Sequence, residues 1–243
     1  MKPEFIFPDW PAPRNIKSAV TTRIGGVSQS PYGGFNIASH VEDEPESVRQ
    51  NRQLLKEVLA LPAEPVWLEQ VHGVRVIDAA IETDHRADAS YTGNNKVVCS
   101  VMTADCLPVL FCNRAGSKVA AAHAGWRGLA EGVLEATIDA LAEQNENILA
   151  WLGPAIGPEV FEISDEVRDI FLRNNVQAES AFRASKPGHW LADLYELARQ
   201  RLATKGVTQV FGGGECTYSD SVRFYSYRRD GKTGRMASLI WIE

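Results

Sequence analysis

The chain has 243 residues, of which 44% are hydrophobic and 23% are charged, an ordinary composition for a globular protein. Its formal net charge of -6 argues against non-specific nucleic-acid binding, which needs a positive surface. Residues Met1 to Trp10 contain no uninterrupted apolar region of a secretory signal, and no segment approaches the roughly 18 apolar residues of a membrane span. We therefore expect a cytoplasmic protein with reduced cysteines and no nucleic-acid or membrane partner. A local basic pocket can still bind a small anion.

The N-terminal part is predicted to contain one strand, one glycine-rich loop and one helix. Residues 17–23 are rich in β-formers, and a loop of Gly, Ser, Pro and Asn follows as far as Ser39. Backbone amides of Gly25 and Gly26 can approach an anion beside Arg23, although on the motif alone a plain turn is the favoured explanation. Residues 45–60 carry apolar side chains at helical spacing, with acidic residues first and a proline after the end, and so predict a helix.

The middle of the chain alternates apolar runs with turn signals and predicts mainly strands. The expected strands are residues 66–68, 74–77, 96–103, 108–112, 118–122 and 148–152. A polar loop is expected at residues 82–86, where His85 is explained by solvation. Residues 129–144 repeat apolar side chains like an amphipathic helix, and residues 153–158, rich in Gly and Pro, predict a constrained loop.

The last third predicts two helices, at residues 165–174 and 191–205, and closing strands at residues 207–211, 222–227 and 237–242. Between the last two strands, residues 227–235 concentrate four cations around Asp230-Gly231. That pair signals a hairpin turn, whereas the cations can also recruit a phosphate or carboxylate. No repeat, low-complexity tract or polar linker divides the sequence, so we predict one mixed α/β domain over residues 1–243.

Three residues with reactive side chains stand at the ends of apolar runs: His72, Cys106 and His123. They are 34 and 17 positions apart, so only the fold can bring them together. Three N/S ligands with a fourth position open to water match a catalytic rather than a structural zinc site. The alternatives are hydrogen-bonded structural histidines and a cysteine that acts as a small hydrophobic residue.

Other polar residues are weaker candidates. Asp105 is next to Cys106 and can orient a ligand by a hydrogen bond, although a turn or cap role fits equally well. Asn36 and His40 lie in or just after the glycine-rich loop and are candidate pocket residues, with a surface position as the alternative for His40. His189 calls for no more than a structural role.

Several motifs together carry a resemblance to a known family. They are residues 22–28 (TRIGGVS), 69–73 (EQVHG), 102–108 (MTADCLP), 122–128 (AHAGWRG), 153–157 (GPAIG) and 225–230 (YSYRRD). The chain resembles the YfiH family, also described as laccase-domain or polyphenol oxidase proteins, as peptidoglycan editing factor and, through the human relative FAMIN, as purine nucleoside phosphorylase. One departure is Glu215, where the family suggests a different, often basic, residue.

The resemblance implies an α/β/α sandwich with a mixed sheet, similar to the catalytic domain of cytotoxic necrotising factor toxins. It also implies that His72, Cys106 and His123 are both the metal ligands and the catalytic centre. The expected metal is Zn²⁺, with Cu²⁺ as the alternative. The oligomeric state is left open, with a monomer as one possibility.

The chemistry that we favour from the sequence is that of a zinc-dependent purine nucleoside enzyme. Such an enzyme performs phosphorolysis of adenosine, inosine, guanosine and methylthioadenosine, and deamination of adenosine, so its partners are a nucleoside and phosphate. A fork of guanidinium donors suits a phosphate. The candidate substrate or phosphate contacts are Arg23, Asn36, Arg127, Arg228 and Arg229.

Two other chemistries use the same residues. In a cysteine-type amide hydrolase, His123 deprotonates Cys106 for attack on a peptidoglycan precursor such as UDP-MurNAc-L-Ser. In a copper-dependent polyphenol oxidase, copper occupies the same three ligands. Because one blue-copper centre alone uses two His and one Cys, the five histidines of the chain are too few for a conventional multicopper site. A non-catalytic metal-buffering module is the least favoured alternative.

Overall fold

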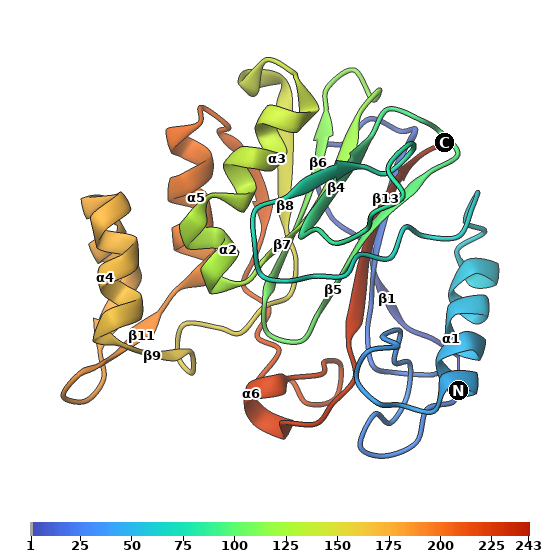
Figure 1. Cartoon of the computed structure of the whole chain (residues 1–243), viewed down its shortest axis with the longest axis horizontal. Coiled ribbons are helices and arrows are strands. Elements are labelled where there is room, and N and C mark those ends of the chain that lie inside the picture. Colours follow the sequence, from blue (N-terminus) through green and yellow to red (C-terminus); the bar gives the residue numbers. More distant parts are fainter. Residues whose placement is uncertain (1) are drawn as a thin grey trace.

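Two β-sheets form the centre of the protein, which the computed structural model describes over residues 2–243 (Figure 1). The larger sheet has six strands in the order β12-β8-β6-β7-β4-β3. Its outer pairs β12–β8 and β3–β4 are parallel and its inner pairs are antiparallel, so the sheet is mixed. Its strands are β3 (Val76–Asp78), β4 (Ala89–Thr92), β6 (Leu107–Asn113), β7 (Val119–Ala124), β8 (Ile148–Leu152) and β12 (Gln209–Gly212).

The second sheet is antiparallel, with the order β1-β2-β13-β5. Its strands are β1 (Phe5–Ile6), β2 (Ile16–Thr21), β5 (Val98–Thr103) and β13 (Met236–Ile242). A third, small antiparallel sheet consists of β9 (Glu162–Ser164), β10 (Phe182–Ala184) and β11 (His189–Ala192). It lies beside helix α4 (Asp165–Asn174), at the edge of the molecule (Figure 1).

Helices cover the two outer faces of the paired sheets. Helices α2 (Trp126–Glu131), α3 (Val133–Leu141) and α5 (Leu194–Thr204) lie on the side of the six-stranded sheet, and α1 (Pro45–Val58) lies on the side of the second sheet (Figure 1). The one-turn helix α6 (Tyr227–Asp230) and short 3₁₀ turns at Asn145–Asn147 and Val176–Ala181 complete the elements. The mixed α/β fold with helices outside and a mixed sheet inside is therefore confirmed, with a β layer that is two sheets thick.

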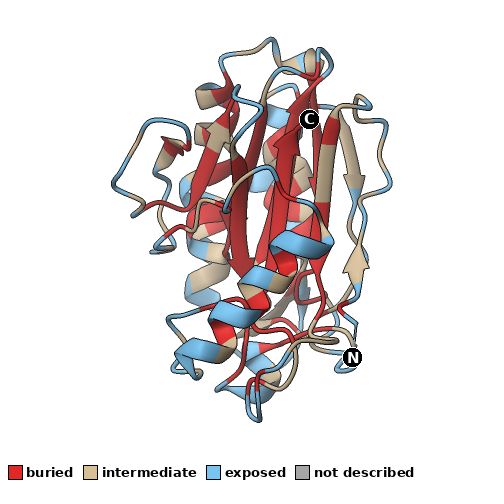
Figure 2. Ribbon diagram, turned by 90° about the vertical axis from the view of Figure 1, so that its right-hand side faces the viewer, coloured by how far each residue is buried: buried red, intermediate tan, exposed pale blue. Residues whose placement is uncertain are grey.

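The core follows the alternation of side chains along the central strands. In β6, Leu107, Val109 and Phe111 face the helices, whereas Leu110 and Cys112 face the second sheet, because successive strand residues point to opposite faces. The central strands β5, β6, β7, β8 and β13 are buried along their whole length (Figure 2). This explains why β6 and β7 are continuous apolar runs in the sequence rather than alternating ones.

The predicted helix at residues 129–144 is two helices. It begins earlier, at Trp126, and Gly132 separates α2 from α3 with a φ of 106°, a conformation that L side chains avoid and glycine adopts freely. The helix predicted from residue 191 begins at Leu194, because the Asp193 side chain accepts hydrogen bonds from the amides of Tyr195 and Glu196 and caps it.

The strand and hairpin predicted around residues 222–235 are also absent from the described structure. Ser226 accepts a hydrogen bond from the Arg229 amide and begins α6, and Gly231 ends that helix with a φ of 66°. The Asp-Gly pair thus ends a helical turn. Residues 66–68 form one isolated bridge, between Val66 and Cys99, rather than a strand. The short strands β1, β4, β9, β10 and β11 were not predicted.

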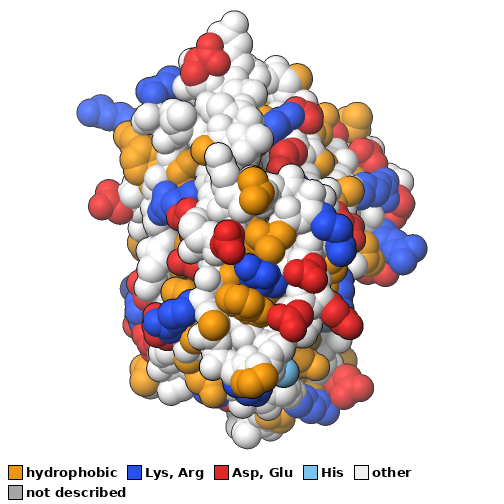
Figure 3. Space-filling model, turned by 90° about the vertical axis from the view of Figure 1, so that its left-hand side faces the viewer, with side chains coloured by type: hydrophobic (Ala, Val, Ile, Leu, Met, Phe, Trp, Pro, Cys, Tyr) orange, Lys and Arg blue, Asp and Glu red, His pale blue; other side chains and the backbone are white. Residues whose placement is uncertain are grey.

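The surface mixes charged and apolar side chains on the face beyond α4. There the hydrophobic side chains are interspersed with acidic and basic ones (Figure 3). No helix within residues 2–243 is long and apolar enough to cross a membrane.

Candidate metal centre and its cavity

His123 lies near the end of β7, where the interface between the two sheets opens. Ala120, Ala122 and Ala124 of β7 face the helices, whereas Val119 and Ala121 face the second sheet, and by the same alternation His123 points to that side. The imidazole is 3% exposed, and its Nδ1 is 2.8 Å from Asp88 Oδ1. We assign the proton to Nδ1, because an ionised carboxylate can only accept. Nε2 is then available to bind a metal.

Asp88 connects both histidines through one fully buried carboxylate. Its Oδ1 accepts hydrogen bonds from His123 Nδ1 and from the His72 amide at 2.9 Å, and its Oδ2 accepts from the amides of Gly73 at 2.7 Å and Val71 at 3.2 Å. Burial raises the pKa of Asp88, but these hydrogen bonds, that of His123 first, lower it below its ordinary value. The carboxylate therefore stays ionised and holds the His72 loop against the end of β7.

His72 approaches the centre from an exposed loop in which its own φ is 62°. The loop is anchored on the other side by Gln70, whose amide group donates to the Met102 carbonyl at 2.8 Å and accepts from the Met102 amide at 2.7 Å. His72 Nε2 lies 3.8 Å from Cys106 Sγ. A Cβ atom on Gly125 would come within 2.9 Å of the His72 ring and 3.0 Å of Cys106 Sγ, so glycine leaves space for the donors here.

Cys106 lies in residues 104–106, the three-residue link by which the chain passes from β5 in one sheet to β6 in the other. Asp105, with a φ of 92°, fixes this link. Its carbonyl accepts from the Ile156 amide at 2.9 Å, and its carboxylate accepts from the Thr217 hydroxyl at 2.6 Å and the Arg228 amide at 2.7 Å. Asp105 therefore joins the Cys106 link to three other segments and makes no hydrogen bond to the metal-ligand candidates.

Cys106 and His123 perturb each other's protonation. Burial raises the pKa of the Cys106 thiol, but the charge and hydrogen bonding of His123, with those of His72, outweigh burial and lower it to about 6. Burial lowers the pKa of His123, whereas the Cys106 thiolate and the Asp88 carboxylate raise it. In the absence of a metal, both shifts favour a pair formed by the Cys106 thiolate and the His123 imidazolium.

The three donor atoms fit one metal ion. The ligand atoms of His72, Cys106 and His123 all lie within 4.8 Å of one another. Zinc bonds of about 2.0 Å to nitrogen and about 2.3 Å to sulfur, at tetrahedral angles, place donors roughly 3.5 Å apart, so a small inward movement completes the geometry. In the part of the chain that the structure describes, this is the only such group of three. Three protein donors leave a fourth position open.

A cavity of about 390 Å³ opens over these ligands, within the range of small-molecule sites. Its lining combines the three ligands with apolar side chains, polar side chains and two guanidinium groups. The lining residues are His40, Gln70, His72, Met102, Thr103, Ala104, Asp105, Cys106, His123, Ile156, Phe161, Tyr227, Arg228 and Arg235.

Of the five residues predicted to contact substrate or phosphate, Arg228 lines this cavity and the other four do not. Arg23 stacks on the Tyr225 ring and donates to a carbonyl. Arg229 donates to the carbonyls of residues 217, 218 and 224. Asn36 is buried in a loop network, and Arg127 is exposed over the Trp126 ring.

Two residues with direct effects on the site escaped sequence analysis. Asp88 stood beside an unrecognised strand. The signal that could have identified it is an acidic residue between two alanines before a segment of small residues. Arg235 closes the predicted cationic loop but was not singled out from it. The weaker candidate His40 does line the cavity.

Glu215, the departure from the expected pattern, forms an ion pair with Arg223 at 2.6 Å and is not part of the cavity lining. His189 lies in β11, with Nδ1 3.2 Å from the Pro187 carbonyl, a local backbone contact.

Comparison with known proteins gives a consistent set of relatives. A sequence model described as multi-copper polyphenol oxidoreductase laccase matches residues 17–243. A Pseudomonas aeruginosa protein named purine nucleoside phosphorylase is 55% identical over 240 residues, covering 98% of each chain. The Escherichia coli protein named purine nucleoside phosphorylase YfiH is 55% identical over 241 residues, covering 98% of this chain and 99% of that one.

Solved structures show the same fold. A Neisseria meningitidis protein of the DUF152 family superposes with a TM-score of 0.95 at 51% identity, covering 98% of this chain and 99% of that one. YlmD from Geobacillus stearothermophilus superposes with a TM-score of 0.87 at 31% identity, covering 99% and 100%.

Proposed function

We propose, since the chain belongs to the multi-copper polyphenol oxidoreductase laccase family that includes the YfiH proteins, that it is a zinc-dependent purine nucleoside phosphorylase of the cytoplasm. Its substrates are adenosine, inosine, guanosine and methylthioadenosine, and it also deaminates adenosine. The observation that carries the proposal is one cavity that combines the His72, Cys106 and His123 donors with two guanidinium groups. The names of the relatives support the reaction.

The cavity has the two kinds of surface that a purine nucleoside and phosphate require. Met102, Ile156 and Phe161 supply apolar walls against which a purine ring can pack. Arg228 and Arg235 supply cations. No ion pair within residues 2–243 uses either guanidinium: Arg228 Nη1 donates to the Glu162 carbonyl.

Arg235 is more buried than Arg228. Its pKa also responds to the charge of the metal-ligand candidate Cys106. Its Nη1 donates to the carbonyls of Thr233 and Gly234 at 2.8 and 3.0 Å. Burial lowers the pKa of Arg235, and the negative charges of Cys106 and Asp105 oppose that shift. A guanidinium remains charged in proteins, so Arg235 places a fixed positive charge beside the ligands. Its free donors suit a phosphate.

His72, Cys106 and His123 are the residues that would hold the zinc ion. When bound, zinc supplies Lewis acidity at the base of the cavity. The contribution of the chain is to orient the donors: Asp88 fixes the tautomer of His123 and the position of the His72 backbone. The Asp105 contacts fix the link that carries Cys106. Such supporting contacts have large effects on metal affinity.

In phosphorolysis, a phosphate oxygen forms a bond to C1′ of the ribose while the C1′–N9 bond breaks. The bonding electrons leave with the purine, which takes up a proton, and the product is ribose 1-phosphate. Arg228 and Arg235 hold the phosphate and lower its repulsion from other negative groups in the site. Positioning of the two reactants contributes much of the rate enhancement in such a reaction. The other predicted contacts, Arg23, Asn36, Arg127 and Arg229, stay predictions.

Product analysis tests this proposal directly. The zinc-loaded protein should convert inosine to hypoxanthine and ribose 1-phosphate only with phosphate present, and it should convert adenosine to inosine without phosphate. Cys106→Ala should abolish both reactions while the protein stays folded, and Cys112→Ala, at a buried thiol distant from the cavity, should remain active. Equal activity of Cys106→Ala and the wild type would refute the three-ligand centre.

One observation favours a second function, that of a cysteine-type amide hydrolase acting on a peptidoglycan precursor. Cys106, His123 and Asp88 have the connectivity of a nucleophile, a base and an orienting carboxylate. Metal-free protein should then release L-serine from UDP-MurNAc-L-Ser, and chelators should leave that activity intact. The same protein should then be assayed in zinc buffer without chelator. If it loses the amide hydrolysis and gains phosphorolysis, the two functions belong to the metal-free and zinc-loaded forms.

The third chemistry, polyphenol oxidation with copper, uses the same three donors. The described residues hold one such cluster, so a copper-loaded protein would have one copper site of this kind. We favour this activity less than phosphorolysis and amide hydrolysis. It is tested by oxidation of a phenol with copper-loaded and zinc-loaded protein side by side.

A further inference from the structure

A second cavity, of about 510 Å³, adjoins the cavity over the metal ligands. The two cavities share His40, Gln70 and Met102 in their linings, so these side chains form the boundary between them. Beyond this boundary the second cavity is lined by Arg52 from α1 and by Trp67. A ligand that fills the first cavity can therefore extend past His40 toward Arg52.

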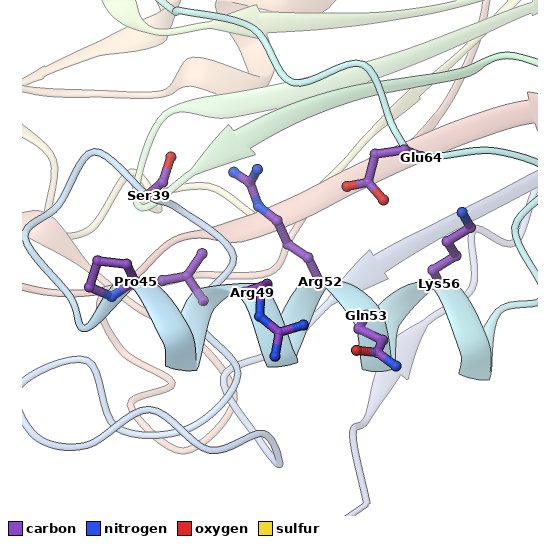
Figure 4. A pocket seen from close by; sticks show the side chains of 8 residues that line it. Ser39, Pro45, Arg49, Arg52, Gln53, Lys56 and Glu64 are labelled. Atoms are coloured by element: carbon purple, nitrogen blue, oxygen red, sulfur yellow. The ribbon is translucent and has the colours of Figure 1, made fainter.

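Arg52 is presented to this second cavity in a fixed orientation. Its guanidinium carbon lies 4.3 Å from the centre of the Trp67 ring, and its Nε donates to the Ile37 carbonyl at 2.9 Å. The two terminal nitrogens have no hydrogen-bond partner within residues 2–243. Figure 4 shows the side chain rising from α1 toward the space between Ser39 and Glu64. Held by stacking and one hydrogen bond, the fork keeps its outer donors available for an anion.

The acidic residues of the second cavity are occupied by other partners. Asp84 forms an ion pair with Arg75, and Glu69 lies 3.8 Å from Arg86. Glu64, on the outer side, accepts a hydrogen bond from Trp67 Nε1 at 2.8 Å and makes no ion pair within 4 Å of Arg52 among the described residues. Burial lowers the pKa of Arg52 and the negative charge of Glu64 opposes that shift, but no ion pair among the described residues occupies the Arg52 guanidinium, which stays available to a ligand.

His40 connects the two cavities electrostatically. Its pKa is lowered by burial and then by the charges of Arg235 on one side and Arg52 on the other. The lowered pKa favours neutral His40, which lies at the boundary between Arg228 and Arg235 in the first cavity and Arg52 in the second. These three guanidinium groups offer more positive charge than one phosphate ion needs.

We propose that the second cavity is an anion subsite that receives the 5′-phosphate of a purine nucleotide, so that purine nucleoside 5′-monophosphates are ligands and substrates of this protein. The proposal rests on the proposed function for the location of the nucleoside. With the base and ribose over the metal ligands, the 5′ substituent passes His40 and meets Arg52. In the reaction, inorganic phosphate forms the new bond to C1′, the C1′–N9 bond breaks, and the purine leaves with the electron pair and gains a proton. The other product is ribose 1,5-bisphosphate.

Calorimetric binding to the zinc-loaded full chain tests the subsite without requiring turnover. The ligands are inosine, inosine 5′-monophosphate and inorganic phosphate alone. The variants are Arg52→Gln, Arg52→Lys and the matched control Arg49→Gln, which removes an exposed cation one turn away on α1 that pairs with Glu46. Melting curves of all variants check that they are folded.

We expect the wild type to bind inosine 5′-monophosphate about tenfold or more tighter than inosine, which corresponds to about 1.4 kcal/mol. Arg52→Gln should remove this advantage and Arg49→Gln should keep it. Arg52→Lys should retain about threefold, because lysine keeps the charge but loses the fork.

Equal affinity of the wild type for the two ligands, or an advantage that survives Arg52→Gln, would overturn the proposal. A phosphate-binding event that depends on Arg52, together with no advantage for the nucleotide, would also overturn it and assign the cavity to free phosphate. If the nucleotide advantage is found but inosine is not phosphorolysed, the subsite stands and the proposed function fails. Detection of ribose 1,5-bisphosphate is the additional test of the reaction.

Discussion

The replacement Asp88→Asn tests how the metal centre is held together. The carboxylate accepts four hydrogen bonds, from His123 Nδ1 and from the amides of Val71, His72 and Gly73. Asparagine keeps one oxygen and puts an NH₂ group against donors that then have no acceptor. Hydrogen bonds to a charged group contribute about 1.5–3 kcal/mol each and a buried unsatisfied donor costs about 1–3 kcal/mol, so we expect the free energy of unfolding to fall by roughly 2–4 kcal/mol.

For a chain of this size each kcal/mol shifts the melting temperature by about 2–4 °C, so the variant should melt roughly 4–16 °C lower. Zinc affinity, measured by competition with a chromophoric chelator, should fall by about 10- to 100-fold, as for other residues that orient metal-binding histidines. The matched control is Asp84→Asn, an exposed acid of the same segment that pairs with Arg75; surface pairs contribute little.

The pH dependence of the same variant is a second readout. Because the pKa of Asp88 is lowered in the folded protein, its contribution to stability is present above the ordinary value of 3.8 and is lost as the pH falls through the lowered folded pKa. Asp88→Asn should remove that contribution at every pH. A variant with wild-type melting temperature and zinc affinity would show that the buried carboxylate does not organise the site.

Three further predictions concern residues around the cavity. Gly125→Ala should weaken zinc binding by about tenfold or more, because the new Cβ would meet the side chains of two metal-ligand candidates. The melting temperature should change little, because the backbone φ of -62° at residue 125 suits alanine. Unchanged zinc affinity would contradict this prediction. In metal-free protein, the fast alkylation of Cys106 by iodoacetamide should rise with pH with a midpoint near its pKa of about 6, since the thiolate is the nucleophile, and a midpoint above 8 would be inconsistent with a stabilised thiolate. Arg228→Gln and Arg235→Gln should each raise the KM for phosphate by about tenfold, and Arg127→Gln in the same assay decides whether that exposed residue, predicted from the sequence, takes part.

The sequence predicted the ligand candidates and most central strands because both depend on local signals. His72, Cys106 and His123 end apolar runs, and those runs are strands or lie beside them. The resemblance to the YfiH family, confirmed by the relatives, gave the helical layers and the mixed sheet. Single-sequence patterns could not show that the chain changes sheets at Cys106, because a sheet boundary leaves no trace in periodicity.

The errors arose where tertiary contacts override local pattern. Strand β4 is short, and its residues are small or polar, so no apolar alternation marks it. Asp230-Gly231 predicts a hairpin in isolation, yet the Ser226 cap and the hydrogen bond from the Arg228 amide to Asp105 turn the segment into a helical turn. Asp88 was missed for a related reason: its importance lies in four donors that only the fold assembles.

The passage of the chain from one sheet to the other at residues 104–106 has a consequence for folding. His123 belongs to the six-stranded sheet, Cys106 to the link between the sheets, and His72 to a loop anchored on β5 of the second sheet. The three donors therefore meet only after the two sheets have docked, so a metal ion at this site would bind the folded chain much more tightly than any partly folded form. A metal ion held by the three donors would connect the two layers, and its binding energy would add to the stability of the docked sheets and oppose their separation during unfolding.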